Sequence, residues 1–387
     1  MKVAIVCDVL GKSNNGTTIA LTNLINSLRN KGHEVTVVCP DADKKDVPGY
    51  AVVPVRRFLP LASAILRSNG VKLAKPDKKL MTKVISECDV VHVEIPLSLG
   101  VCAAKIARKL NKPMTVAFHM QAENLTAHFG LMNFEPANRL VYKTIYSLVY
   151  EKAFAVHYPT RFIKDVFENT VRKKTNAYVI SNGVNKEFFK NADEKFDRVS
   201  DKFTILCAGR LSAEKAQQQL IYALSKSKHK DDIHVLFAGD GPKKHKLTRL
   251  IKKYDVDAEF KFFTREQLIA AQHGSDLYVH TALMEIEALC CIEAIVSGLV
   301  PLICNSPKSA TASFAIDENN LFTPFDSAEL AAKIDFWYEH PELIKVYKER
   351  YRKTISAFDQ SACMDKMEKM LYDAYSSANK NGSGNEN

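Results

Sequence analysis

The chain has 387 residues, of which 46% are hydrophobic and 25% charged, and its formal net charge is +10 at pH 7. This length is too great for one compact core and predicts two domains. No run of eighteen apolar residues occurs and the start of the chain turns polar after ten residues, so we expect neither a membrane-spanning helix nor a secretory signal. Nine scattered cysteines without a Cys-x-x-Cys pair are typical of reduced core residues in a cytosolic protein.

The positive charge is confined to the N-terminal half. Residues 1–178 hold 26 Lys and Arg against 14 Asp and Glu, whereas residues 179–387 hold 28 against 30. Such asymmetry predicts that one domain faces an anionic phospholipid surface, a nucleic acid or an acidic glycan. A basic surface that is merely solvated remains the alternative.

Short β-branched runs alternate with helical segments along both halves, which is the rhythm of parallel sheets in α/β domains. We expect the first series of strands at residues 2–7, 34–39, 88–93, 114–119, 155–159 and 177–180. A second series is expected at residues 203–209, 233–239, 259–263, 276–280 and 299–304. The resulting prediction is two doubly wound, Rossmann-like domains at 1–180 and 203–358, a polar linker at 181–202, a C-terminal helix at 359–378 and a disordered tail at 379–387.

Doubly wound domains bind ligands at the carboxyl ends of their strands, so the working site is expected in a cleft between the two domains. After the first strand the chain passes Asn15 and Gly16 into a helix, without the Gly-x-Gly-x-x-Gly pattern of dinucleotide binding. Gly16 could present backbone N–H groups to a phosphate. A plain turn with Thr17 or Thr18 capping the helix is equally compatible.

The second series of strands opens with Gly209-Arg210 and, five residues on, Lys215. A guanidinium and an ammonium at this point could clamp a diphosphate and stabilise it as a leaving group without a metal. A solvated helix start is the alternative, although cations oppose the usual preference of that end of a helix.

Two glutamates stand eight residues apart near the fourth strand of this series. Glu285 lies in the loop after the strand, and Glu293 lies in an otherwise apolar helix, where a carboxylate needs a dedicated donor such as a ribose hydroxyl or a buried amide. A structural salt bridge is the competing account. In the N-terminal half, His119 ends a strand at the expected cleft and is either a structural or a catalytic histidine.

These residues resemble the retaining glycosyltransferases of family four, which have the GT-B architecture of two Rossmann-like domains. The matching motifs are Gly-Arg-Leu-Ser-x-Glu-Lys at 209–215, Glu-x7-Glu at 285–293, Ala-Gly-Asp-Gly-Pro at 238–242 and Ser-Asn-Gly-Val at 181–184. Within the family the chain resembles the bacterial enzymes that glucosylate diacylglycerol or sterol. This likeness rests on residues 14–17, 74–77, 119–124 and 298–311.

The resemblance implies that a nucleotide-sugar, expected to be UDP-glucose, binds the C-terminal domain and that a lipid such as diacylglycerol binds the N-terminal one. The final helix is expected to return to the N-terminal domain. The implied reaction retains anomeric configuration by front-face attack, with neither metal nor cofactor. His119 and Glu285 are implied as the catalytic residues beside the sugar, and the implied donor-binding residues are Gly16, Arg210, Lys215, Thr264, Ile286, Glu287, Ala288, Leu289 and Glu293.

The chain departs from the family pattern at two places. It has Glu285-Ile286-Glu287-Ala288 where the family commonly has Glu-Gly-Phe-Gly, and Ala216 where Gly or Asn is usual. Loss of these glycines leaves the identity of the sugar open. Glu287 competes with Glu285 for the place beside the sugar, but the spacing to Glu293 favours Glu285.

A basic and apolar segment at 56–79 holds seven basic residues and one acidic residue, as expected of a segment that lies on an anionic bilayer. A helix packed on the sheet with a charged outer face is the alternative. We therefore expect a cytoplasmic protein bound peripherally to the inner face of the cell membrane. The residues expected at the acceptor or the membrane are Asn15, Arg56, Arg57, Phe58, Arg67 and Lys72.

Three other functions compete with this interpretation. The same chemistry could act on a soluble sugar or polysaccharide. A non-catalytic binder of nucleic acid or membrane is disfavoured, and nucleic acid is not expected as a partner, because the cation-rich segments lack nucleic-acid signatures and interleaved stacking aromatics. A hydride-transfer enzyme is disfavoured by the missing glycine fingerprint.

Overall fold

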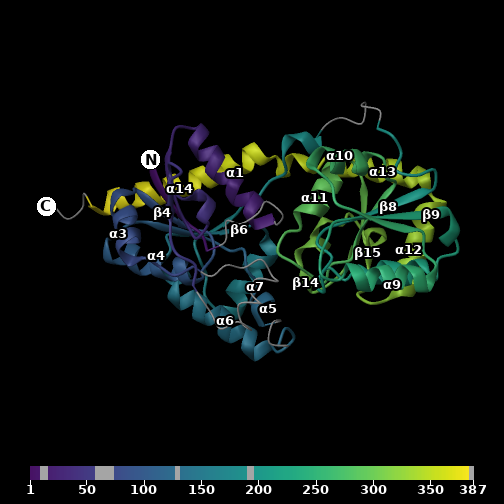
Figure 1. Ribbon diagram of the computed structural model, residues 1–387, viewed down its shortest axis with the longest axis horizontal. Helices are drawn as coiled ribbons and strands as arrows, with labels where there is room; N and C mark the ends of the chain where they lie inside the picture. Colours follow the sequence, from purple (N-terminus) through teal and green to yellow (C-terminus); the bar gives the residue numbers. More distant parts are fainter. Residues whose placement is uncertain (9–15, 57–73, 127–130, 190–195, 383–387) are drawn as a thin grey trace. The chain divides into compact units, whose positions relative to one another are not determined.

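The structure is a computed structural model that describes residues 1–8, 16–56, 74–126, 131–189 and 196–382. It divides into two compact units (Figure 1). Unit 1 comprises residues 1–182 and 361–387, and unit 2 comprises residues 183–360. Residues 183–189, expected in the linker, belong to unit 2, where Val184 and Phe188 pack in a buried cluster with Ile292 and Val296.

Unit 1 is built on a seven-stranded sheet in the order β3-β2-β1-β4-β5-β6-β7, with every pair parallel. The order changes direction between β1 and β4, which makes their carboxyl ends the topological switch point. The strands are β1 (Lys2–Val6), β2 (Glu34–Cys39), β3 (Tyr50–Val52), β4 (Val90–Val93), β5 (Met114–Ala117), β6 (Ala155–Tyr158) and β7 (Ala177–Val179).

Helices cover both faces of this sheet (Figure 1). They are α1 (Gly16–Asn30), α3 (Lys78–Glu87), α4 (Ser98–Lys109), α5 (Ala122–Thr126), α6 (Glu135–Leu148), α7 (Arg161–Val171) and α14 (Gln360–Gly382). The C-terminal helix α14 buries Met364, Met367 and Leu371 in one cluster with Leu21 and Leu28 of α1, so the end of the chain completes the core of unit 1.

Unit 2 has a six-stranded parallel sheet in the order β10-β9-β8-β11-β13-β15, whose switch point lies between β8 and β11. The strands are β8 (Phe203–Ala208), β9 (Ile233–Ala238), β10 (Ala258–Lys261), β11 (Leu277–His280), β13 (Val300–Cys304) and β15 (Leu321–Phe322). A separate parallel pair, β12 (Met284–Glu285) and β14 (Lys308–Ser309), joins the loops that follow β11 and β13.

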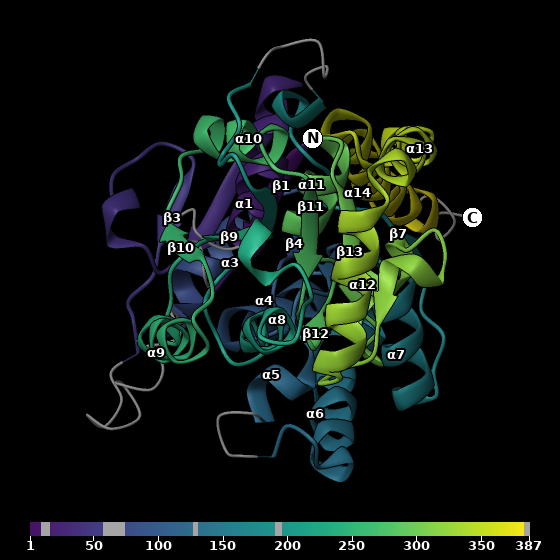
Figure 2. The ribbon, with the colours of Figure 1, turned by 90° about the vertical axis from the view of Figure 1, so that its right-hand side faces the viewer.

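The helices of unit 2 are α8 (Gln218–Leu224), α9 (Lys244–Tyr254), α10 (Arg265–His273), α11 (Leu289–Val296), α12 (Ser327–Glu339) and α13 (Pro341–Arg352). Figure 2 shows α8, α9 and α12 together on one side of the sheet, with α10 and α13 on the other. Short 3₁₀ helices occupy Ala42–Lys44, Tyr150–Lys152, Lys186–Phe189, Lys230–Asp232, Ala310–Phe314, Glu318–Asn320 and Ile355–Phe358.

The predicted α/β class with two doubly wound domains is confirmed. Within the described residues, every helix is too short or too polar to cross a membrane. All nine cysteines are free thiols. Of the residues expected at the acceptor or the membrane, Arg56 is exposed, whereas Asn15, Arg57, Phe58, Arg67 and Lys72 lie outside the described residues.

Candidate active site

The loop that follows β8 passes unusually close to the loop that follows β9. A Cβ atom on Gly239 would lie 2.1 Å from the Gly209 carbonyl oxygen, and one on Gly241 would lie 2.4 Å from the Leu211 carbonyl oxygen. The Gly209 N–H donates to Ala238 at 2.9 Å, which ties the two strand ends together. Only glycine fits this approach at positions 239 and 241, whereas position 209 favours glycine because its φ is 138°.

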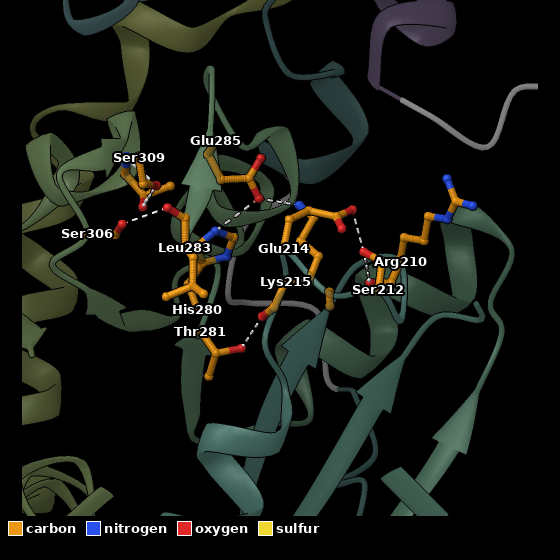
Figure 3. Close-up of polar contacts among 12 residues, drawn as sticks. Arg210, Ser212, Glu214, Lys215, His280, Thr281, Leu283, Glu285, Ser306 and Ser309 are labelled. Carbon is orange, nitrogen blue, oxygen red and sulfur yellow. Dashed lines mark hydrogen bonds and ion pairs between the residues drawn. The ribbon is translucent and has the colours of Figure 1, made fainter. Parts of the chain in front are cut away.

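The same loop is fastened to the segment after β11, across the switch point of the unit 2 sheet. The Thr281 hydroxyl donates to the Lys215 carbonyl at 2.7 Å, and the Leu283 N–H donates to the Glu214 carbonyl at 2.8 Å (Figure 3). The Ser306 hydroxyl in turn donates to the Leu283 carbonyl at 2.6 Å. These bonds place Lys215 and Glu285 side by side although 70 residues separate them.

Four titratable side chains, which we call the Lys215 cluster, meet here: Lys215, His280, Glu285 and Cys290. The Lys215 ammonium is ion-paired with Glu285 Oε1, and His280 Nε2 lies 3.3 Å from the same oxygen. Burial alone would raise the pKa of Glu285, but the charge of Lys215 and the hydrogen bond from His280 bring it down to about 2. Burial alone would lower the pKa of Lys215, but Glu285 and Cys290 hold it above its usual value. Lys215 and Glu285 are therefore both charged at neutral pH.

His280 and Cys290 are functional candidates that the sequence analysis missed. His280 is buried and its Nδ1 lies 3.2 Å from the Tyr278 hydroxyl. Burial alone would raise the pKa of the Cys290 thiol, but Lys215 and His280 lower it on balance. His280 could have been predicted as a site residue because it ends a predicted strand. The residues next to Cys290 in the sequence gave no indication that cations lie near its thiol.

Arg210 and Lys215, predicted to act together, do not point to the same place. Arg210 is exposed, and Figure 3 shows its guanidinium directed away from Glu285, toward which Lys215 points. The structure thus brings Lys215 and Glu285 together, whereas the Arg210 side chain lies on the exposed surface of unit 2. An exposed cation at this edge can still reach an anionic ligand, because its long side chain has several rotatable bonds.

Glu293 lies on α11 among buried apolar residues. The described residues give its carboxyl neither a hydrogen bond nor an ion pair, and burial raises its pKa to about 7, against a small opposing effect of Arg265. A structural salt bridge, the alternative considered from the sequence, is therefore absent among the described residues. A buried carboxyl without a donor is well suited to accept hydrogen bonds from a ligand.

The other expected donor-site residues lie at helix N-termini or directly before them. Thr264 is the N-cap of α10, where its hydroxyl accepts from the Gln267 N–H at 3.3 Å in a capping box. Glu287 is buried, Ile286 is partly exposed, and Leu289 is the first residue of α11. Gly16 is the first residue of α1, as expected.

Ala216 and Ala288, which stand where the family commonly has glycine, both keep a left-handed backbone, with φ of 49° and 63°. The loop conformation is therefore retained without the glycines. In an L-residue this conformation costs about 1–2 kcal/mol, which is partly offset by burial of the methyl group at about 0.8 kcal/mol and by lower chain entropy in the unfolded state.

We therefore expect Ala288→Gly to leave the free energy of unfolding within about 0.5 kcal/mol of the parent, because these terms nearly cancel. Ala331 is equally buried but lies inside α12. There Ala331→Gly should cost about 1–2 kcal/mol, since helix propensity and methyl burial are both lost. Urea unfolding of the two variants checks the difference, and equal losses would contradict the assignment of strain to Ala288.

In unit 1, His119 follows β5 and forms a buried ion pair with Glu94, which follows β4 at the switch point of the sheet. The distance between His119 Nε2 and Glu94 Oε1 is 3.2 Å. His92 and His157 flank the pair, and the sequence analysis predicted a role for neither of them nor for Glu94. In the described part of the chain, no set of three or more His, Cys, Asp or Glu is arranged to hold a metal ion.

Comparison with known proteins gives two family matches that together span most of the chain. Residues 14–188 match "Glycosyltransferase Family 4" and residues 188–354 match "Glycosyl transferases group 1". Among curated proteins, the alpha-monoglucosyldiacylglycerol synthase of Acholeplasma laidlawii is 23% identical over 89% of this chain and 90% of its own length. A GDP-mannose-dependent alpha-mannosyltransferase of Corynebacterium glutamicum is 24% identical over 78% and 72%.

Solved structures share the fold. The Anabaena protein HepE, in complex with UDP and glucose, aligns with a TM-score of 0.71 at 17% identity over 96% of this chain and 99% of its own. Sucrose-phosphate synthase from Thermosynechococcus elongatus aligns with a TM-score of 0.74 at 15% identity over 97% and 100%. The GT-B fold is thereby confirmed.

Proposed function

Because the chain belongs to the family-four glycosyltransferases, we propose that it transfers a hexose, glucose in the first instance, from a UDP-sugar to a membrane lipid such as diacylglycerol. The binding of the UDP-sugar is supported by the ion pair of Lys215 with Glu285 at the switch point of unit 2. Close by in sequence is Glu293, whose carboxyl accepts no hydrogen bond within the described residues. Strand ends at a switch point are where doubly wound domains bind ligands.

In the proposed reaction, Lys215 and Arg210 stabilise the negative charge that develops on the departing diphosphate. Glu293 accepts hydrogen bonds from the ribose hydroxyls, and Glu285 lies beside the sugar. The acceptor hydroxyl attacks the same face from which the diphosphate leaves, and a phosphate oxygen takes its proton, so the anomeric configuration is retained. The cations of the chain supply the positive charge, and neither a metal nor a protein nucleophile is needed.

The lipid acceptor is supported by an exposed apolar surface on unit 1, which we call the apolar corner: Leu125, Leu131, Phe134 and Leu140. Phe134 is 53% and Leu140 67% exposed. Among the twelve exposed large hydrophobic residues of the described chain, these four fall within sixteen positions. Single exposed apolar residues are ordinary, but four within so short a stretch of the chain favour an interaction surface.

The corner is a defined piece of structure with cationic neighbours. The Leu131 N–H donates to the Thr126 carbonyl at the end of α5, and the Phe134 N–H donates to Leu131 at 2.9 Å, so the turn holds these side chains at the start of α6. Arg139 and Lys143 are exposed on α6. Apolar side chains beside exposed cations suit an anionic bilayer, where each nearby cation contributes about 1 kcal/mol.

We expect Phe134→Ser combined with Leu140→Ser to weaken binding to anionic phosphatidylglycerol vesicles about tenfold or more, since both side chains lose the apolar contact with the bilayer. The matched control is Phe262→Ser with Phe325→Ser, which removes side chains that are 74% and 66% exposed on unit 2. Vesicle cosedimentation checks both. Equal binding by the two double variants would contradict the placement of the membrane surface. If the parent forms a dimer that only the first variant loses, the apolar corner binds a second copy of the chain instead.

The function itself is tested with labelled UDP-glucose, UDP-galactose and GDP-mannose, each incubated with the protein and a bacterial lipid extract. Label from UDP-glucose in the organic phase is the expected result. Label from GDP-mannose instead would follow the mannosyltransferase relatives and overturn the donor assignment. Transfer of label to soluble sugars alone would overturn the assignment of a lipid acceptor. It would also overturn the proposal that the protein binds peripherally to the inner face of the membrane.

A further inference from the structure

Glu94 is a buried carboxylate that the proposed reaction does not yet use. It follows β4 directly, and only 2% of its surface is exposed. Its position is fixed by its own N–H, which donates to the Val6 carbonyl of β1 at 3.0 Å. The carboxylate therefore sits at the carboxyl ends of β1 and β4, where unit 1 is expected to bind its ligand.

Two histidines approach this carboxylate. His119 Nε2 lies 3.2 Å from Oε1, and His92 Nε2 lies 3.4 Å from Oε2. His92 donates or accepts at its other nitrogen with the Thr115 hydroxyl of β5, at 2.8 Å. The side chains of Glu94 and His119 are 3% and 5% exposed, so water screens the pair very little.

The electrostatics favour a charged pair. Burial alone would raise the pKa of Glu94, but the positive charge of His119 and the close approach of both histidine rings hold it well below its usual range. The coupling between two charges is reciprocal, so the carboxylate that His119 keeps ionised also keeps the proton on His119. A buried charge of either sign alone would be far more costly.

A further histidine lies beside the His119 ring and is neutral. The His157 ring of β6 lies edge-on to His119 with centroids 5.5 Å apart. Burial and the charge of His119 lower the pKa of His157 to about 3, so it is neutral and donates through Nε2 to the Ile180 carbonyl at 2.7 Å. Glu123 of α5 accepts a hydrogen bond from the Tyr142 hydroxyl at 2.8 Å. The charge on His119 is thus balanced by Glu94.

We propose that Glu94 is a positioning residue for the transferase: it orients the His119 ring through Nε2 and keeps it protonated, so that the substrate meets a charged imidazolium. Without the carboxylate, a neutral ring would present a lone pair at one of its nitrogens instead. The chemical class recognised is an oxygen that is a hydroxyl or gains negative charge in the reaction. The substrate assignment rests on the proposed function, whereas the protonation of His119 does not.

The test compares Glu94→Gln with the parent over pH 5.5–9. The amide keeps the shape of the carboxylate but not its charge, so His119 should lose its proton about 1–3 pH units lower. We expect kcat of Glu94→Gln to be within about twofold of the parent at pH 5.5 and at least tenfold lower at pH 8, because the ring is protonated in both proteins only at the lower pH. NMR titration of the histidine Cε1–H resonances, with His119→Asn for assignment, measures the proton directly.

Glu168→Gln is the matched control, because Glu168 is equally buried in unit 1 but accepts from Thr175 and lies near Lys174. It should change activity by the same factor at every pH. A pH-independent loss in Glu94→Gln, or an unchanged His119 titration, would overturn the proposal. A shifted titration in a protein that transfers no hexose from any donor would leave the role of Glu94 in His119 protonation standing and overturn the proposed function alone.

Discussion

Lys215→Met should lower kcat/KM for hexose transfer about 10²–10³-fold, the usual effect of removing one preorganised charge at a developing anion. Lys215 is the only lysine or arginine that the described structure pairs with Glu285, and its side chain is only 19% exposed, so solvent screens its charge weakly. The loss should fall mainly on kcat, because negative charge on the departing diphosphate is greatest in the transition state. Steady-state kinetics with saturating acceptor measures both terms.

Stability must be separated from chemistry in this experiment. Removing one member of a buried ion pair leaves the other uncompensated and typically costs about 3–5 kcal/mol, so Lys215→Met alone is expected to be less stable. Adding Glu285→Leu removes the orphaned charge and should restore much of the melting temperature without restoring activity. Lys261→Met, at a half-exposed ion pair with Glu259, is the control for loss of a lysine. Because Glu285 is itself placed beside the sugar, the double variant reports on stability alone. A Lys215→Met protein that keeps kcat/KM within about tenfold of the parent, when assayed well below its melting temperature, would contradict the chemical role of Lys215.

The major strands could be predicted from the sequence because their pattern is local. The short pair β12 and β14 and the edge strands β3 and β15 were not predicted, since two or three residues carry no usable period and their pairing depends on segments far away in the chain. The capping box of Thr264 and Gln267 could have been predicted from their spacing of three residues. The family resemblance instead predicted Thr264 as a residue that binds the nucleotide-sugar.

Site residues could be predicted where the spacing of residues along the chain identifies them. They could not be predicted where only their burial in the folded protein does. Glu293 was predicted because a glutamate in an apolar helix is unusual, and Glu285 because it precedes Glu293 by eight residues in the loop after a strand. Glu94 did not, because a single acidic residue after a strand has the pattern of a solvated loop. Its burial comes from the neighbouring strands β1 and β5, and its histidine partner is 25 residues away in sequence, so only the assembled sheet reveals the pair.

Glu293→Gln should change nucleotide binding and stability in opposite directions. Ribose hydroxyls that donate to a carboxylate form charge-assisted hydrogen bonds worth about 1.5–3 kcal/mol, so the neutral amide should weaken UDP binding about 10–100-fold. Donation to the ionised form also favours that form, so the parent should bind UDP more tightly as pH rises through about 7, the folded-state pKa of Glu293. Calorimetric titration at pH 6 and pH 8 checks this, and the variant should show little pH dependence.

The stability of the unliganded protein should respond with the opposite sign. In the unfolded chain a glutamate titrates near about 4.3, below the folded value of about 7, so the unfolded state releases this proton first. Stability from the protonated form is therefore complete below pH about 4.3 and is lost as pH rises to about 7, by roughly 4 kcal/mol in total. Glu293→Gln should remove this loss and be more stable than the parent at pH 8 but not at pH 5. The exposed Glu349→Gln should change neither quantity, and a variant that loses both stability and UDP affinity would mean that Glu293 supports the fold rather than the ligand.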